Sequence, residues 1–323
     1  MTLYIFSNTL RKPAKCLVRI GAAQRLITQP HAFIKTLTVD SRRDQSTLAT
    51  LQLSARRNQG RGGSAHEAGL FGVDQPILIA ADFGTHTEEV MRGFVRDITA
   101  RYRSPCSRPS QVTIVCQDES LRLDRRRIRR IWRGEKPTSD RHVAAAILQQ
   151  HGLALDPDSG DGSHHPMLHQ NDTDLGFLQA RAEANGYDLL FKEGQVYFGP
   201  MRLDAEPQAV IRVHSGGMAH CRHFVFQRRR RRCASPVFHR ARGELHSASY
   251  RRVLRVGEPV DIAGVGAAYD GTYYVDTVRH RFTARTYRQF FTLLRSGADH
   301  EVGDDITIRP ESGPSCALLR RHN

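Results

Sequence analysis

Lysine is scarce in this chain, although the chain is strongly basic. Its 323 residues include 48 basic and 33 acidic side chains, a formal net charge of +15, and only 5 of the basic residues are lysine. Such an arginine excess also arises from a GC-rich coding sequence, so part of it reflects background composition. A net charge of this size nevertheless favours an acidic partner: nucleic acid, an anionic membrane or an acidic protein surface.

Long hydrophobic runs and paired cysteines are also missing. No stretch approaches the roughly 18 apolar residues of a membrane span, and residues 1–12 lack the apolar region of a signal peptide. We therefore expect no membrane insertion. The six cysteines form no CxxC pair, which in a chain of this length argues against a disulfide framework. Aromatic residues make up only 7%, few for a platform on which nucleic-acid bases stack.

The first third of the chain predicts antiparallel β-structure. Short, partly alternating apolar segments are separated by polar or glycine-rich residues, a spacing typical of a sandwich or barrel. The expected strands are residues 15–20, 32–39, 47–54, 76–83, 90–100 and 111–118.

The middle of the chain predicts a small α/β unit. Residues 139–151 carry apolar residues at helical spacing, followed by Gly152. Asn171 or Asp172 is the expected N-cap of a second helix, which ends at Gly186. A hairpin with a Glu193-Gly194 turn follows over residues 187–198. Beyond it, strands are expected at 253–263, 272–282 and 287–295, with a polar tail from Ser296.

Arginine is concentrated in two segments. Residues 222–255 hold 11 Arg and one acid, Glu244, and include the run Arg228, Arg229, Arg230, Arg231 and Arg232. A solvated loop, or one that docks on an acidic protein, is favoured over a phosphate-binding loop because few aromatic residues interleave with the charge. Residues 101–133 hold 10 Arg, and Ile128, Ile131 and Trp132 among them predict a short helix with one buried face.

The chain shows no recognisable catalytic or metal-binding motif. It has no G-x-S-x-G elbow and no phosphate-binding loop. Its histidines and cysteines between residues 214 and 246 lack the close pairs that structural zinc sites use. We therefore expect no enzyme activity, no metal and no cofactor.

Two segments carry a family resemblance. Residues 171–200, "NDTDLGFLQARAEANGYDLLFKEGQVYFGP", and 270–295, "DGTYYVDTVRHRFTARTYRQFFTLLR", resemble the baseplate hub proteins and phage late control protein D of contractile tails. Weaker similarity covers residues 94–123. The matching positions are Asp174, Leu175, Phe177, Leu178, Gly186, Tyr187, Phe198, Gly199, Pro200, Gly271, Tyr273, Tyr274, Val275, His280, Tyr287, Phe291 and Arg295.

The resemblance implies a mainly β fold with an α/β insert, in which two tube-like β-barrels per subunit build a trimeric, pseudo-six-fold ring. On this reading residues 1–120 form the first barrel domain, 121–200 the insert, 201–297 the second barrel domain and 298–323 a flexible tail. Hubs related to VgrG continue into a spike, which this sequence does not show, so the spike is expected to be a separate protein.

The function that the resemblance implies is structural. The chain would join a six-fold inner tube to a three-fold spike in the baseplate of a contractile phage tail or injection particle, after assembly in the bacterial cytoplasm. The expected partners are two further copies of the chain, the inner tube protein, the spike, and wedge or tape-measure proteins, with Arg228–Arg232 as a docking segment. Two alternatives stay open: an arginine-rich nucleic-acid-binding protein and a tail-associated peptidoglycan hydrolase.

Overall fold

The computed structural model describes residues 14–27, 34–54, 71–101, 111–134, 137–214, 219–227 and 238–296. None of the helices in these ranges is both long and apolar enough to cross a bilayer.

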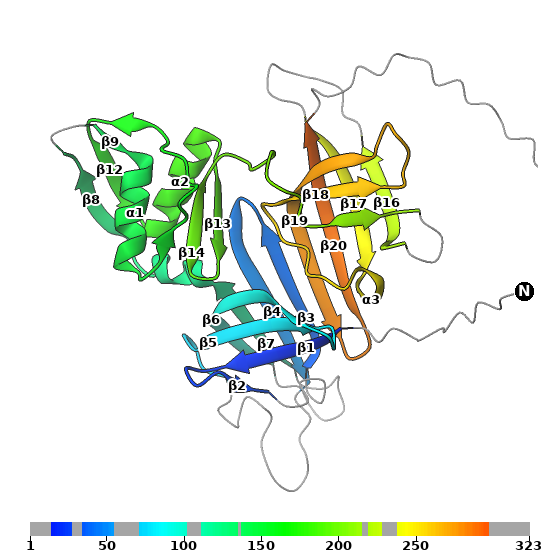
Figure 1. Ribbon diagram of the computed structural model, residues 1–323. Coiled ribbons are helices and arrows are strands. Elements are labelled where there is room, and N and C mark those ends of the chain that lie inside the picture. Colours follow the sequence, from blue (N-terminus) through cyan, green and yellow to red (C-terminus); the bar gives the residue numbers. More distant parts are fainter. Residues whose placement is uncertain are drawn as a thin grey trace, which may run out of the picture.

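One large sheet organises the chain (Figure 1). Its strand order is β16-β17-β20-β19-β3-β4-β7-β6-β5-β1-β2, with β18 pairing β19 and β15 pairing β18. All neighbours are antiparallel except β15 and β18. The bounds are β1 Lys15–Ile20, β2 Arg25–Leu26, β3 Ile34–Arg42, β4 Gln45–Ser54, β5 Pro76–Asp82, β6 Thr87–Arg101, β7 Gln111–Asp118, β15 Val210–Arg212, β16 Cys221–Gln227, β17 Phe238–His246, β18 Pro259–Ala263, β19 Gly271–Thr283 and β20 Tyr287–Ser296.

Strands β3 and β19 connect the two ends of the sequence. Residues 36–42 pair with residues 277–283, so the N-terminal and C-terminal strands share one continuous ladder. In β3, Leu37 and Val39 are buried while Thr36 and Thr38 are only half-buried, the alternation expected of a strand with one face on a core. The chain is thus mainly β, with a curled antiparallel sheet and few helices.

The α/β insert lies between β7 and β15 and extends to one side of the sheet (Figure 1). Its hairpin, β13 and β14, is the part nearest β3 and β4. A 4-residue helix, α3 (Ser247–Tyr250), follows β17 outside the insert. The insert consists of η2 Glu119–Leu123, β8 Ile128–Trp132, β9 Thr138–Ser139, α1 Asp140–Gln150, β10 Ala154–Leu155, β11 His164–His165, β12 Leu168–Asp172, α2 Asp174–Asn185, β13 Asp188–Lys192 and β14 Gln195–Gly199.

Both predicted helices are confirmed, with one corrected cap. Ser139 caps α1 by accepting from the His142 amide. The N-cap of α2 is Thr173, whose hydroxyl accepts from the Gly176 amide, and not Asn171 or Asp172. Those two residues instead belong to β12, which pairs with β8. Gly186 ends α2 at φ +65°, where a side chain would be strained.

One predicted element was wrong and another was too long. Residues 128–132 form strand β8 and no helix, because pairing with β12 imposes a period of two. Trp132 and Arg130 then share a side of the strand, with the guanidinium 4.8 Å from the indole ring. The strand expected over 253–263 is limited to β18, residues 259–263, and a turn at Gly257, with φ +78°, precedes it.

Three groups of buried apolar side chains form the core. The first lies among β1 to β7, the second inside the insert, and the third among β15 to β20. Val253, Phe282 and Tyr287 come from the C-terminal part yet pack in the first group. The N-terminal strands therefore complete their core only with side chains from the end of the sequence. The domain boundaries at 120, 200 and 297 stay a prediction.

Candidate functional site

Most of the family-resemblance residues lie in cores. Leu175, Leu178 and Phe198 are buried in the insert, and Tyr273, Val275 and Phe291 in the third core. The exposed exceptions, Gly186 and Pro200, end α2 and follow β14. The resemblance therefore falls on packing positions, and the assembly role assigned to them stays a prediction. The other members are placed as follows: Asp174, Phe177 and Gly199 are buried, as are Tyr274, His280 and Tyr287; Tyr187, Gly271 and Arg295 are half-buried.

A buried carboxylate fastens the insert to the sheet. Asp188, at the start of β13, has a side chain with no exposed surface, and its Oδ1 lies 2.8 Å from Nη1 of Arg43. Its Oδ2 accepts from the Tyr274 hydroxyl at 2.7 Å. Arg43 also contacts Asp276 through Nε, at 2.9 Å. These four residues come from three distant segments: the β3–β4 turn, the insert and β19.

Burial dominates the electrostatics of this cluster. Loss of hydration raises the pKa of Asp188, while hydrogen bonds from Tyr274 and Arg43 act in the opposite direction. The hydrogen bonds from Tyr274 and Arg43 are therefore what favours the charged form of the Asp188 carboxylate. Removing one of these partners would leave a buried polar group without compensation, which destabilises the folded state. Sequence reasoning singled out Tyr274 but missed Arg43, Asp188 and Asp276. An acid between apolar residues in "GYDLL" was the available signal.

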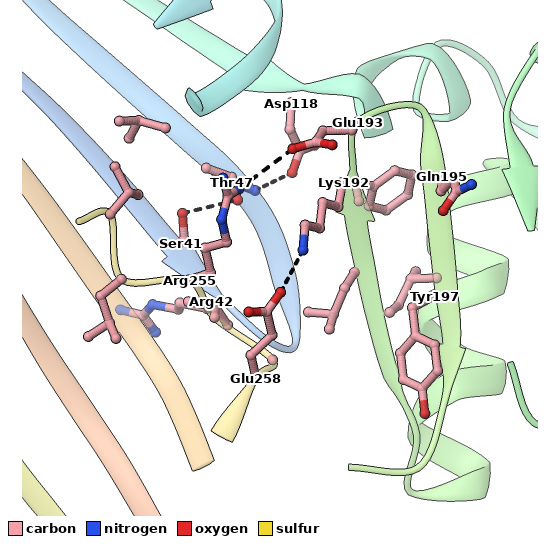
Figure 2. A pocket seen from close by; sticks show the side chains of 18 of the residues that line it. Ser41, Arg42, Thr47, Asp118, Lys192, Glu193, Gln195, Tyr197, Arg255 and Glu258 are labelled. Atoms are coloured by element: carbon pink, nitrogen blue, oxygen red, sulfur yellow. Dashed lines mark hydrogen bonds and ion pairs between the residues drawn. The ribbon is translucent and has the colours of Figure 1, made fainter. Parts of the chain in front are cut away.

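A cavity of about 450 Å³ separates the insert hairpin from the sheet. Figure 2 shows its lining: Ser41, Arg42 and Thr47 on one side and Lys192, Glu193 and Tyr197 on the other. Across it, Lys192 Nζ reaches Glu258 Oε1 at 2.6 Å. Its lining holds basic and acidic side chains in equal number, so it offers no concentrated charge for a ligand. Its geometry suits a joint between two parts of the chain.

Asp118 closes one end of this joint. Its Oδ2 accepts from the Thr47 amide at 2.7 Å and its Oδ1 from the Ser120 amide at 3.1 Å. Burial raises the pKa of this carboxyl to about 6, against the lowering effect of these hydrogen bonds. The residue caps η2, where β7 passes into the insert. Its role is to fix that turn.

One face of the sheet is rich in arginine. Register places Thr277 opposite Arg42, Arg281 opposite Arg288, and Thr292 opposite Arg242. Arg279 lies between Thr277 and Arg281 on the same side of β19. One side of β17, β20, β19 and β3 therefore carries five arginines, here called the basic face: Arg42, Arg242, Arg279, Arg281 and Arg288. Most of them line a hollow of about 470 Å³ with Phe290.

Few acids balance the basic face. Asp40 pairs with Arg279, and Glu244 lies 3.5 Å from Arg288 Nε. Arg281 stands directly opposite Arg288, a cross-strand pair of like charges that costs stability. Sequence reasoning missed this surface because its members come from three regions. The alternation of Arg279 and Arg281 in a predicted strand was the signal. The predicted docking segment, Arg228–Arg232, lies outside the described residues.

Comparison with known proteins identifies the family. The model of the Alg8 N-terminal domain matches residues 28–217, more than half of the chain. The chain belongs to this family. No curated protein matches it in sequence.

Solved structures of phage tail and type VI secretion proteins share this fold. The chain is similar to the 43 kDa tail protein of prophage MuSo2 from Shewanella oneidensis (TM-score 0.63, 10% identity), over 87% of this chain and 97% of that one. It is similar to a tail protein from Neisseria meningitidis (TM-score 0.62, 8% identity, 87% and 96% covered). An E. coli component of the type VI secretion system, similar in structure to the T4 tail proteins gp27 and gp5, matches at TM-score 0.56 with 11% identity (81% and 73% covered). At these identities the likeness shows the fold. This family member thus has the fold of phage tail and type VI secretion proteins.

Proposed function

We propose that the chain is a structural component of a contractile phage tail or phage-tail-like injection system, and within it the baseplate hub. The observation that carries the proposal is the extent of the structural match: a tail protein matches over 87% of this chain and 97% of its own, at a TM-score of 0.63. The proposal needs no catalytic centre, and its mechanism is assembly.

In the proposed hub, three copies form a ring, and each copy supplies two tube-like barrel segments from its continuous sheet. The ring joins the inner tube on one side to a separate spike on the other, with wedge or tape-measure proteins around it. The long ladder through β3 and β19 supports this reading, because it makes the two sheet halves of one copy a single mechanical unit.

The charge of the chain indicates that its partners present acidic surfaces. The basic face carries five arginines against two acids, Asp40 and Glu244. Acidic surfaces on the tube, spike or wedge proteins would relieve the repulsion between Arg281 and Arg288. Electrostatic docking of this kind speeds association and weakens with salt.

The test is the assembly state of the purified full-length chain. Light-scattering mass measurement, alone and with the inner tube protein of the same particle, should give a trimer or a stable complex. A monomer that never retains the tube protein at any salt concentration would refute the hub role. Reversing Arg229, Arg230 and Arg231 to Glu should weaken assembly in a salt-dependent way, whereas Arg25→Glu, on an exposed edge strand, should not.

The same preparation separates the alternatives. Filter binding to DNA with a steep salt dependence would favour a nucleic-acid-binding protein. Clearing of peptidoglycan in a zymogram would favour a hydrolase. The hub reading expects neither result.

A further inference from the structure

A second basic site lies on the insert, away from the joint and from the basic face. A cavity of about 540 Å³ opens between η2, the start of β8 and the C-terminal end of α1. Four arginines line it: Arg122 from η2, Arg125 and Arg126 from the connection to β8, and Arg130 from β8. Leu123, which is 1% exposed, forms part of its apolar floor.

The positive charge in this cavity is largely uncompensated. Arg122 donates to the backbone carbonyl of His151 at 3.3 Å, and Arg130 to the side-chain amide of Gln150 at 3.2 Å, so both partners are neutral. Arg126 makes no hydrogen bond or ion pair within the described ranges. Arg125 pairs with Asp74 at 3.0 Å, but both side chains are more than half exposed, and such pairs are weak.

The one carboxylate in the cavity lining, Asp174, already contacts other side chains. Asp174, whose side chain is 3% exposed, lies 2.8 Å from Nε2 of His151 and accepts from Gln170 at 2.6 Å. It therefore orders the wall and forms no ion pair with an arginine among the described residues, and its single charge offsets at most one of the four arginines. The C-terminal end of α1 would repel an anion, but Arg122 donates to the carbonyl of His151, the residue that caps this end.

We propose that this arginine pocket binds a small multivalent oxyanion, one that bears two or more adjacent phosphate or carboxylate groups. Guanidinium groups bind both oxyanions through paired, charge-assisted hydrogen bonds. Several converging arginines over an apolar floor favour a ligand with more charge than a single phosphate. The site does not depend on the hub role, so either proposal can fail alone.

Calorimetric titration of the full-length protein at low salt tests the pocket, with inorganic pyrophosphate, inorganic phosphate and citrate as probes. Pyrophosphate should bind at least tenfold more tightly than phosphate, and binding should weaken as salt rises. Citrate binding as tight as pyrophosphate would assign a polycarboxylate ligand, and pyrophosphate alone a phosphorylated one. Both results support the site.

Variants separate the pocket from general surface charge. Arg126→Gln should weaken pyrophosphate binding at least tenfold with an unchanged thermal midpoint, because Arg126 supports no other described group. Arg129→Gln is the matched control: Arg129 is exposed on β8, next to Arg130 but outside the cavity lining. Absence of pyrophosphate binding to the native protein, or equal loss in both variants, would overturn the proposal.

Discussion

Asp188→Ala is the sharpest test of how the insert is held on the sheet. The substitution removes the shared partner of Arg43 and Tyr274 at once. Tyr274 is 1% exposed, so its hydroxyl is left buried without an acceptor, which costs about 1–3 kcal/mol. Arg43 keeps Asp276 and is 30% exposed, so its share is smaller. The total should lie near ~3 kcal/mol, at the lower end of the range for breaking a buried pair.

Urea unfolding followed by circular dichroism measures this loss. With a denaturant slope of about 3 kcal/mol per molar, the midpoint should fall by about 1 M. Asp188→Asn should cost less, because the amide can still accept from Arg43 and pair with the Tyr274 hydroxyl. A double-mutant cycle with Tyr274→Phe should give a coupling energy of about 1 kcal/mol or more.

A control variant separates this buried cluster from surface charge. Lys192→Gln breaks the Lys192–Glu258 pair across the same joint, but the lysine side chain is 54% exposed. An exposed pair is worth about 0–1 kcal/mol. If Asp188→Ala costs no more than Lys192→Gln, or shows no coupling to Tyr274, the account of the buried cluster is wrong.

Two further variants test other buried contacts. Burial lowers the pKa of His280 to about 3, so the folded state resists protonation of this side chain. The contribution of His280 to the free energy of unfolding is therefore complete above pH 6.5 and is lost as pH falls, by about 2 kcal/mol at pH 5. His280→Asn should therefore lose less stability than the native protein between pH 7 and pH 5 in urea melts, and parallel curves would contradict this; His164→Asn, at an exposed site, is the control. At Gly257, a Cβ would collide with Leu190 Cδ1, the end of a half-buried side chain that can shift, so Gly257→Ala should cost about 1 kcal/mol more than Gly84→Ala, where φ is also positive and no atom lies within 4 Å. Equal thermal and urea midpoints for the two alanine variants would rule out close packing of Leu190 on this turn.

The local signals in the sequence specified the local elements. Apolar spacing, Gly152 and Gly186 located both helices because helix boundaries depend on nearby capping groups. Period-two alternation located most strands of the sheet, because successive side chains of a strand point to opposite faces.

Only the tertiary structure decided which distant segments meet. Residues 128–132 have apolar positions that fit a helix, but pairing with β12 made them a strand. Asp188, Arg43 and Tyr274 converge because β19 pairs with β3 and the insert hairpin folds back on that pair. The arginines of the basic face and of the insert pocket likewise gather through register and loop placement. Composition determined how much positive charge the chain carries; nonlocal strand pairing determined where that charge is concentrated, because long-range contacts depend on the whole fold and leave little trace in a local sequence window.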